Sequence, residues 1–310
     1  MTSVMVTGGF GFIGGAIVRA LLDRGDNVVI LEHPDAVVPP FAAGVEIVRA
    51  DIADPDSVSA VRRADIHAVL HLAGQPSGAR SFSIPVTDLR LNALGTLNMA
   101  VWCNENDVGR LITASTFNVY GDHQGIEVYA EDLPCNPKSV YATSKLAAEQ
   151  LLNTWAGPKG IHWNAMRMFN VYGPGQDITR TDQGVVGIFM HQLMQSPIVE
   201  VKGSLQRFRD LVYIDDVVMA WLMCLESGSS SRAFNVGTGE RTTFENLIRT
   251  IARVVGKHAE LEIVELPGTP GDMLGCVADT TAISRELGFV PRGDLMRGVS
   301  EMYEWVQSNH

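Results

Sequence analysis

Tyr141 and Lys145 lie four residues apart in a segment with a helical pattern, and this spacing puts their side chains on one face, a turn apart. A tyrosine with its ordinary pKa near ~10 is a poor base at neutral pH. A neighbouring ammonium group favours the phenolate and should lower the pKa of the tyrosine. The pair therefore predicts a general base. A hydroxyl of Ser115 or Thr116, at the end of a predicted strand, could orient the oxygen of its substrate.

A glycine-rich run near the start of the chain predicts a binding site for a dinucleotide. Gly8, Gly11 and Gly14 follow a short apolar strand and open a helix. The glycines allow the backbone to approach a pyrophosphate closely, and the first turn of the helix presents free N–H groups to it. The residues predicted to contact the cofactor here are Gly8, Gly11, Phe12, Ile13 and Gly14.

Acidic residues at the ends of the next two predicted strands indicate which dinucleotide binds. Glu32 can accept hydrogen bonds from the adenosine ribose, and its charge would repel a 2′-phosphate, so NAD is favoured over NADP. Asp51 and Ile52 could contact the adenine, although Asp51 could instead cap a helix, a role for which Asp54 competes. A cationic nicotinamide beside Tyr141 would favour the phenolate further. Together the two motifs predict a redox-capable enzyme that acts on an alcohol or a sugar.

The elements that must position these residues alternate between strands and helices over the first two-thirds of the chain. Such alternation predicts an α/β fold, a doubly wound parallel (Rossmann) sheet with helices on both faces. The expected strands are 4–6, 27–32, 46–49, 68–72, 111–115 and 164–169, and the expected helices are 12–24, 55–63, 87–106 and 138–155.

The pattern loosens after residue 171, where a loop over 172–184 rich in glycine and proline is a candidate lid. Later segments predict helices over 185–195, 214–226, 243–255, 280–287 and 295–306, with strands over 198–201, 233–236 and 261–266. We expect residues 1–170, with about 212–237, to form an NAD-binding domain. Residues 171–211 and 238–310 are expected to form a smaller α/β substrate-binding lobe over the strand ends.

Composition excludes several classes of function. The 310 residues are 46% hydrophobic and carry a net charge of −11 without a basic block, so no nucleic-acid partner is expected. No run approaches the ~20 apolar residues of a membrane span, and we see no signal peptide. The four cysteines are scattered, without CxxC or metal-ligand spacing. This predicts reduced thiols, a cytoplasmic location and no metal site.

These motifs, with others along nearly the whole chain, resemble those of extended short-chain dehydrogenases/reductases of the NAD-dependent sugar epimerase/dehydratase family. They are TGGFGFIG (7–14), ADIAD (50–54), HLAGQ (71–75), NALGTLN (92–98), STFNVYGD (115–122), YATSK (141–145), RMFNVYGPGQ (167–176), RFRDLVYIDDV (207–217) and FNVGTG (234–239). The resemblance implies bound NAD and assigns the catalytic hydroxyl to Thr116. It places the cofactor against Leu72, Ala73, Gly74, Gln75, Asn92, Tyr141, Lys145 and Phe169, and the substrate diphosphate against Asn170 and Arg209.

The two residues after Thr116 separate the reactions of this family. Members that are 4,6-dehydratases carry Asp-Glu there, and members that epimerise at C3 or C5 carry an additional acid/base nearby, whereas this chain has Phe117 and Asn118. The resemblance therefore implies 4-epimerisation of a UDP-sugar, and it is greatest to members that epimerise UDP-glucose or UDP-N-acetylglucosamine. Tyr141 would take the proton of the sugar O4 while hydride passes to NAD. Thr116 would hold that oxygen, and Lys145 would bind the nicotinamide ribose.

The segment 267–279 departs from the family pattern. It lacks the arginines that many members place around the Gly-Asp at 271–272 to hold a pyrophosphate, so that contact would rest on Arg209, helped by Lys202 or Arg207. Asp272 stays a predicted substrate contact; a shifted nucleotide or a substrate without a diphosphate is the alternative. Cys276 stands where 4-epimerases carry a bulky aromatic or a small residue, so it is predicted to admit N-acetylated sugars. A plain buried packing residue is the alternative there.

Other readings stay open at this point. A uronate epimerase, decarboxylase or ketoreductase would keep the same fold, and Arg80 could then meet a uronate carboxylate. A nucleotide-sensing regulator without activity would be expected to lose Tyr141 or Lys145, and this chain keeps both. The resemblance also implies a homodimer in which the helices over 87–106 and 138–155 form a four-helix bundle. The apolar residues compatible with the bundle, and equally with packing on the sheet, are Leu91, Leu94, Leu97, Val101, Leu146, Leu151 and Leu152.

Overall fold

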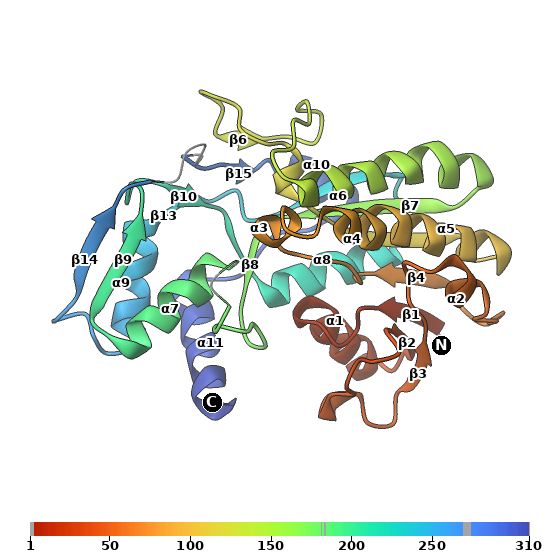
Figure 1. Ribbon diagram of the computed structural model, residues 1–310, viewed down its shortest axis with the longest axis horizontal. Coiled ribbons are helices and arrows are strands. Elements are labelled where there is room, and N and C mark those ends of the chain that lie inside the picture. Colours follow the sequence, from red (N-terminus) through yellow and green to blue (C-terminus); the bar gives the residue numbers. More distant parts are fainter. Residues whose placement is uncertain (1–2, 181, 183, 269–273, 310) are drawn as a thin grey trace.

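A seven-stranded parallel sheet forms the centre of the structure, a computed structural model that describes residues 3–180, 182, 184–268 and 274–309 (Figure 1). The strands lie in the order β3-β2-β1-β4-β5-β7-β12, which reverses direction between β1 and β4, so the predicted doubly wound fold is confirmed. They are β1 (Ser3–Thr7), β2 (Asn27–Glu32), β3 (Glu46–Arg49), β4 (Ala68–His71), β5 (Arg110–Thr116), β7 (His162–Met168) and β12 (Arg232–Val236).

Helices cover both faces of this sheet because the central strands are apolar on both sides. Val4 and Val6 of β1 pack in a cluster with α1 (Phe12–Asp23), α8 (Ile214–Glu226) and α10 (Thr281–Leu287). Met5 points to the other face and packs in a cluster with α2 (Pro55–Ser59) and α5 (Gly95–Glu105). Figure 1 shows α5 beside α6 (Val140–Leu151) on one side of the sheet, with α1 and α8 on the opposite side.

Local sequence signals decide where the helices that border the site begin. The side chain of Ser139 accepts a hydrogen bond from the backbone N–H of Ala142 (3.1 Å) and so starts α6. The carboxylate of Asp54 accepts from the N–H of Asp56 (3.1 Å), so Asp54 caps α2. Gly11 precedes α1 and has no side chain with which to cap it. The first-turn N–H groups of α1 therefore remain available to a ligand.

The long helix predicted over 87–106 consists of three parts. α4 (Pro85–Leu89) runs into a π-helical turn over Arg90–Leu94, which continues into α5. A second π-helical turn, Leu152–Ala156, follows α6. Such turns are rare and often lie at functional sites. The first of them holds Asn92, one of the predicted cofactor contacts.

A third cluster of apolar residues lies beside the sheet, to the left in Figure 1. It joins α7 (Val185–Gln195), α9 (Phe244–Val254), α11 (Leu295–Asn309), β9 (Ile198–Lys202) and β14 (Glu262–Leu266). The C-terminus belongs to this cluster and the N-terminus to the sheet. The predicted division into two domains at the stated residues stays a prediction.

Three short strand pairs near the site are absent from the sequence prediction. They are β8 (Asn170–Tyr172) with β11 (Leu211–Tyr213), β10 (Phe208–Arg209) with β13 (Thr242–Thr243), and β6 (Val128–Tyr129) with β15 (Val277–Ala278). The short helix α3 (Gly78–Ser81) is likewise an addition. Among the described residues, no helix combines the length and the apolar character that crossing a membrane requires.

Candidate active site

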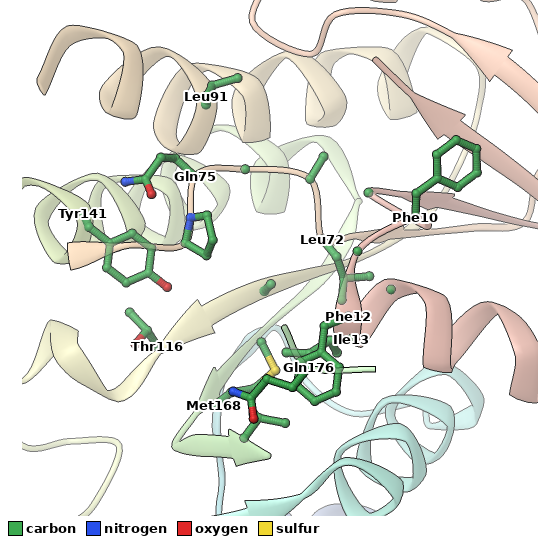
Figure 2. A pocket seen from close by; sticks show the side chains of 18 of the residues that line it. Phe10, Phe12, Ile13, Leu72, Gln75, Leu91, Thr116, Tyr141, Met168 and Gln176 are labelled. Atoms are coloured by element: carbon green, nitrogen blue, oxygen red, sulfur yellow. The ribbon is translucent and has the colours of Figure 1, made fainter. Parts of the chain in front are cut away.

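A cavity of about 770 Å³ opens at the carboxyl ends of β1, β2, β4 and β5, the edge at which doubly wound sheets bind their ligands. The structure gathers most of the predicted cofactor and catalytic residues around this one space (Figure 2). The predicted residues in its lining are Gly8, Gly11, Phe12, Ile13, Gly14, Glu32, Asp51, Ile52, Leu72, Ala73, Gly74, Gln75, Thr116, Tyr141, Lys145, Phe169 and Asn170.

The glycine-rich loop after β1 has no room for a side chain at two of its positions. Gly8 has a φ of +68°, and a Cβ there would lie 2.6 Å from the backbone nitrogen of Ala73. A Cβ on Gly14 would lie 2.2 Å from the carbonyl oxygen of Gly8. Backbone therefore packs on backbone, and the uncapped N-terminus of α1 borders the cavity. This arrangement fits the pyrophosphate of a dinucleotide.

Acidic side chains line the opposite end of the cavity. The Glu32 carboxylate accepts hydrogen bonds from the backbone N–H groups of Phe10 (3.3 Å) and His33 (3.1 Å), which hold it at the wall. Asp51 lies at the same end and accepts from the N–H of Ala53 (2.9 Å). It does not cap α2, which removes that alternative. Two carboxylates at this end suit ribose hydroxyls and disfavour a further phosphate.

Thr116, Tyr141 and Lys145 meet on one wall, where the end of β5 faces α6. Figure 2 shows the hydroxyl of Tyr141 pointing toward Thr116, and a side-chain hydrogen bond joins the two residues. The Nζ of Lys145 donates to the carbonyl of Ala114 (3.0 Å), which ties α6 to β5. The Oγ1 of Thr116 also accepts from the Nδ2 of Asn118 (2.9 Å).

The ionisation of the pair differs from the sequence prediction. Burial raises the pKa of Tyr141 to about 12, and its hydrogen bond with Thr116 only partly opposes this rise. Burial also lowers the pKa of Lys145 to about 8, against the attraction of the carboxylates of Asp88 and Glu149. The protein's own groups therefore do not lower the pKa of Tyr141, because burial outweighs the ammonium. A cationic nicotinamide would supply the further stabilisation that the phenolate requires.

Asn92 supports the wall of the cavity from behind and is not part of its lining. Its Oδ1 accepts from the backbone N–H of Gln75 (3.1 Å), and its Nδ2 donates to the carbonyl of Gln75 (3.1 Å) and to the Oγ of Ser144 (3.1 Å). A Cβ on Gly74 would lie 2.5 Å from the Oδ1 of Asn92, so the packing here is close. The cofactor contact predicted for Asn92 is therefore corrected to an indirect one.

The predicted substrate residues are brought together less completely. Asn170 lines the cavity, and its Nδ2 donates to the carbonyl of Asp210 (3.2 Å). Arg209 lies outside the lining, with its guanidinium 5.2 Å above the ring of Phe244. Asp272 falls outside the described residues. The geometry therefore supports Asn170 as a substrate contact more directly than Arg209.

Cys276 does not line the cavity and is only 1% exposed. It packs in a cluster with Phe117 and Phe169, whose rings stack with their centroids 5.1 Å apart and line the cavity themselves. Burial raises the pKa of the Cys276 thiol to about 12, so the thiol stays neutral. The structure thus favours the packing alternative, and the predicted gate for an N-acetyl group would have to act through the two rings.

The loop expected to form a lid adds polar groups that sequence reasoning missed. Gln176, Asp177 and Arg180 line the cavity, and the guanidinium of Arg180 pairs with the carboxylate of Asp182 (3.1 Å). Arg80, by contrast, is exposed and lies outside the lining. The loop has no hydrophobic period from which side-chain directions could be predicted. Its only sequence signal is its place directly after a strand end.

Comparison with known proteins agrees with this geometry. Residues 4–237 match the NAD dependent epimerase/dehydratase family. The UDP-glucose 4-epimerase of Mycolicibacterium smegmatis is 32% identical over 315 residues, with 98% of each chain covered. The solved UDP-glucose 4-epimerase of Thermotoga maritima, which holds UDP-glucose, superposes with a TM-score of 0.92 at 29% identity over 99% of each chain. That of Thermus thermophilus, in complex with NAD, has a TM-score of 0.88 at 33% identity over 100% of each chain. The chain belongs to the NAD-dependent epimerase/dehydratase family.

Proposed function

We propose that this protein is an NAD-dependent 4-epimerase whose substrate is a nucleotide sugar, in the first place a UDP-sugar. One observation carries the proposal: a single cavity joins the dinucleotide loop to Thr116, Tyr141 and Lys145. The two residues after Thr116, Phe117 and Asn118, also line this cavity and offer no acid or base there. Dehydration of the sugar would need such groups, whereas 4-epimerisation needs only removal and return of a hydride.

Each catalytic residue then has one task. The Tyr141 phenolate takes the proton of the sugar O4 as the C4 hydride leaves, and it returns that proton when the hydride comes back to the other face of the 4-keto sugar. The Thr116 hydroxyl holds O4 beside Tyr141. Lys145 binds the nicotinamide ribose and keeps a positive charge near the phenolate. Bound NAD supplies a reversible hydride acceptor, and it is held by the glycine-rich loop and Glu32.

The substrate diphosphate is the part of this proposal with the fewest cationic contacts. Asn170 lines the cavity and could donate to the diphosphate, and Arg180 brings a guanidinium to the same cavity. Arg209 and Asp272 remain proposed contacts, in which the diphosphate would reach beyond the cavity toward β10. Arg209→Ala and Arg180→Ala, compared by the KM of the nucleotide sugar, would separate these two arginines.

Incubation with NAD and one of three sugars tests the function. We expect the sugar proton signals of UDP-glucose, UDP-N-acetylglucosamine or UDP-glucuronate to show a new 4-epimer by NMR, with no net NADH formed. Net NADH would instead identify a dehydrogenase or reductase. A protein that binds NAD but converts none of the three sugars would contradict the UDP-sugar proposal.

Glu32 is predicted to set the preference for NAD over NADP. Replacing it by alanine removes the carboxylate that faces the ribose, so the Kd for NAD should rise about tenfold. The Kd for NADP should fall, because the repulsion of the 2′-phosphate is lost. Calorimetry with both dinucleotides measures the two changes. Asp35→Ala is the control, since that carboxylate is exposed near the same strand end and outside the cavity lining.

We also propose a homodimer formed through α4, α5 and α6. Four apolar side chains lie exposed on or beside α4: Val86 (71%), Phe82 (64%), Leu89 (44%) and Leu94 (43%). Together they form an apolar face that a second copy could bury. Val86→Glu should therefore yield a monomer in sedimentation velocity. Val290→Glu, at a residue that is 59% exposed but remote from α4, should leave the dimer intact.

The same proposal places the enzyme in the cytoplasm. All four cysteines lie in the described part of the chain and are free thiols. Free thiols are typical of proteins in a reducing compartment. Fractionation of cells, with the protein followed by immunoblot, tests this location.

A further inference from the structure

Asp88 is a carboxylate buried within the wall between the cofactor loop and the catalytic helix. Its exposure is 0%, although it sits on α4, next to residues that face solvent. One oxygen accepts from the Nε2 of Gln75 (2.6 Å), and the other accepts from the Oγ of Ser144 (2.6 Å). Gln75 belongs to the loop that lines the cavity, and Ser144 is the residue before Lys145. Asp88 therefore connects two opposite parts of the active site.

The groups around Asp88 form a closed hydrogen-bonded network. Asn92 donates to Ser144 and to the carbonyl of Gln75, and the Nε2 of Gln75 also donates to the carbonyl of Ser77 (2.8 Å). Every member comes from the loop after β4, from α4 with its π turn, or from α6. Buried networks of this kind keep one geometry because an unpaired member would cost about 1–3 kcal/mol. The network thus sets the position of α6 relative to the cofactor loop.

The charges near Lys145 give Asp88 a second task. Lys145 is 6% exposed and lies between two buried carboxylates, Asp88 and Glu149. Glu149 is already paired with Arg167 through a contact of 2.6 Å. Asp88 has hydrogen-bond donors but no such guanidinium among its described contacts, so its negative charge is directed at Lys145. Both carboxylates raise the pKa of Lys145, Asp88 more than Glu149, and Asp88 also raises the pKa of Tyr141.

The other titratable groups around the pair are accounted for. His71 is buried close to Lys145, but burial lowers its pKa to about 3, so it is neutral. Thr116 contacts Tyr141 through its neutral hydroxyl. The remaining charged residues on elements packed against α6 are either exposed or at the far ends of those elements, namely Arg80, Arg90, Glu105 and Arg110.

We propose that Asp88 is a positioning residue, which fixes the catalytic helix against the cofactor loop and balances the charge of Lys145. It touches neither substrate nor cofactor and acts through Tyr141 and Lys145, so the inference rests on the catalytic roles proposed above. A neutral residue at this place would weaken the hold on the ammonium and, at the same time, make the phenolate easier to form.

The pH dependence of kcat/KM separates this role from a merely structural one. Activity should rise as Tyr141 loses its proton and fall as Lys145 loses its own. Asp88→Asn removes a negative charge that raises both pKa values, so both limbs of the profile should move to lower pH, by about one unit. At pH 8 the variant should be about fivefold less active, because less of its Lys145 is charged.

Two further variants complete the experiment on the NAD-loaded enzyme. Ser144→Ala keeps the charge of Asp88 and removes one donor, so kcat should fall while both limbs stay in place. Asp216→Asn removes another buried carboxylate, which accepts from the N–H groups of Arg292 and Gly293 far from the site, and should leave the limbs unchanged. Asp88→Ser replaces Asp88→Asn if the latter does not fold, with the same expected shift. A profile that does not move in either neutral variant would overturn the proposal.

A direct titration distinguishes failure of this inference from failure of the proposed function. If the wild type converts no sugar, the 15N signal of the Lys145 ammonium, assigned among the five lysines with Lys145→Met, can still be followed by NMR. Its midpoint should lie at lower pH in Asp88→Asn than in the wild type. Equal midpoints would refute the charge role of Asp88 whatever reaction the enzyme performs.

Discussion

Replacing Tyr141 by phenylalanine is expected to lower kcat by about 10³-fold while binding of NAD and of the nucleotide sugar is retained. Removing a positioned general acid/base typically costs about 10²–10⁴-fold in rate. The upper part of that range is expected here because one hydroxyl both takes the proton from O4 and returns it. The ring itself stays in place, since phenylalanine has the same shape and α6 keeps its cap at Ser139. Single-turnover absorbance of the reduced cofactor would measure the loss.

The control for this variant is Tyr303→Phe, which removes a hydroxyl on α11 that accepts from the side chain of Gln307 (2.9 Å). Its kcat should equal that of the wild type. Retention of near-full activity by Tyr141→Phe would mean that another group moves the proton. Calorimetry must show unchanged affinity for NAD in both variants, because a lost cofactor would mimic a lost base.

The sheet could be predicted because each strand is a short apolar run with polar or glycine residues at its ends. Strands 27–32 and 46–49 and helices 185–195 and 214–226 have the predicted bounds. Helix 87–106 was predicted as one piece because a π turn adds one residue to a turn without changing the apolar pattern. The pairs β8–β11 and β6–β15 contain two or three residues a strand, too few for any period.

The cofactor and catalytic residues could also be predicted, since their chemistry depends on contiguous motifs. Gly8 to Gly14 form one turn, and Tyr141 and Lys145 form one helical face. Asp88 could not be found in this way. Its partners are 13 and 56 residues away, and nothing around it in the sequence distinguishes it from a solvated helix residue. Only the fold shows that it is buried.

The ionisation of the site was the weakest sequence prediction, for a physical reason. Charge pairs can be guessed from spacing, but desolvation depends on everything that surrounds the group. Tyr141 and Lys145 share a helical face, as predicted, yet burial moves their pKa values in opposite directions, to about 12 and about 8. The same limit applies to Cys276, whose place behind two aromatic rings has no signature in the sequence.

Replacing Gly14 by alanine should weaken NAD binding by about 100-fold or more. The new Cβ would lie 2.2 Å from the carbonyl oxygen of Gly8 and 2.9 Å from its carbon, and both are backbone atoms that no rotamer change can remove. The start of α1 must then shift away from the loop, which displaces the N–H groups that bind the pyrophosphate. A loss of about 3 kcal/mol in binding corresponds to about this factor. Calorimetry with NAD on the dinucleotide-free protein measures it.

The matched control is Gly109→Ala, because a Cβ on Gly109 meets no atom within 4 Å and its φ is not in the left-handed region. It should bind NAD as the wild type does. Thermal unfolding should place both variants within a few degrees of each other when no dinucleotide is present, since the clash lies in the loop and spares the apolar core. Addition of NAD should then raise the Tm of Gly109→Ala and leave that of Gly14→Ala almost unchanged. Equal shifts in the two variants would show that the loop yields to the side chain, and the pyrophosphate would have to be held elsewhere.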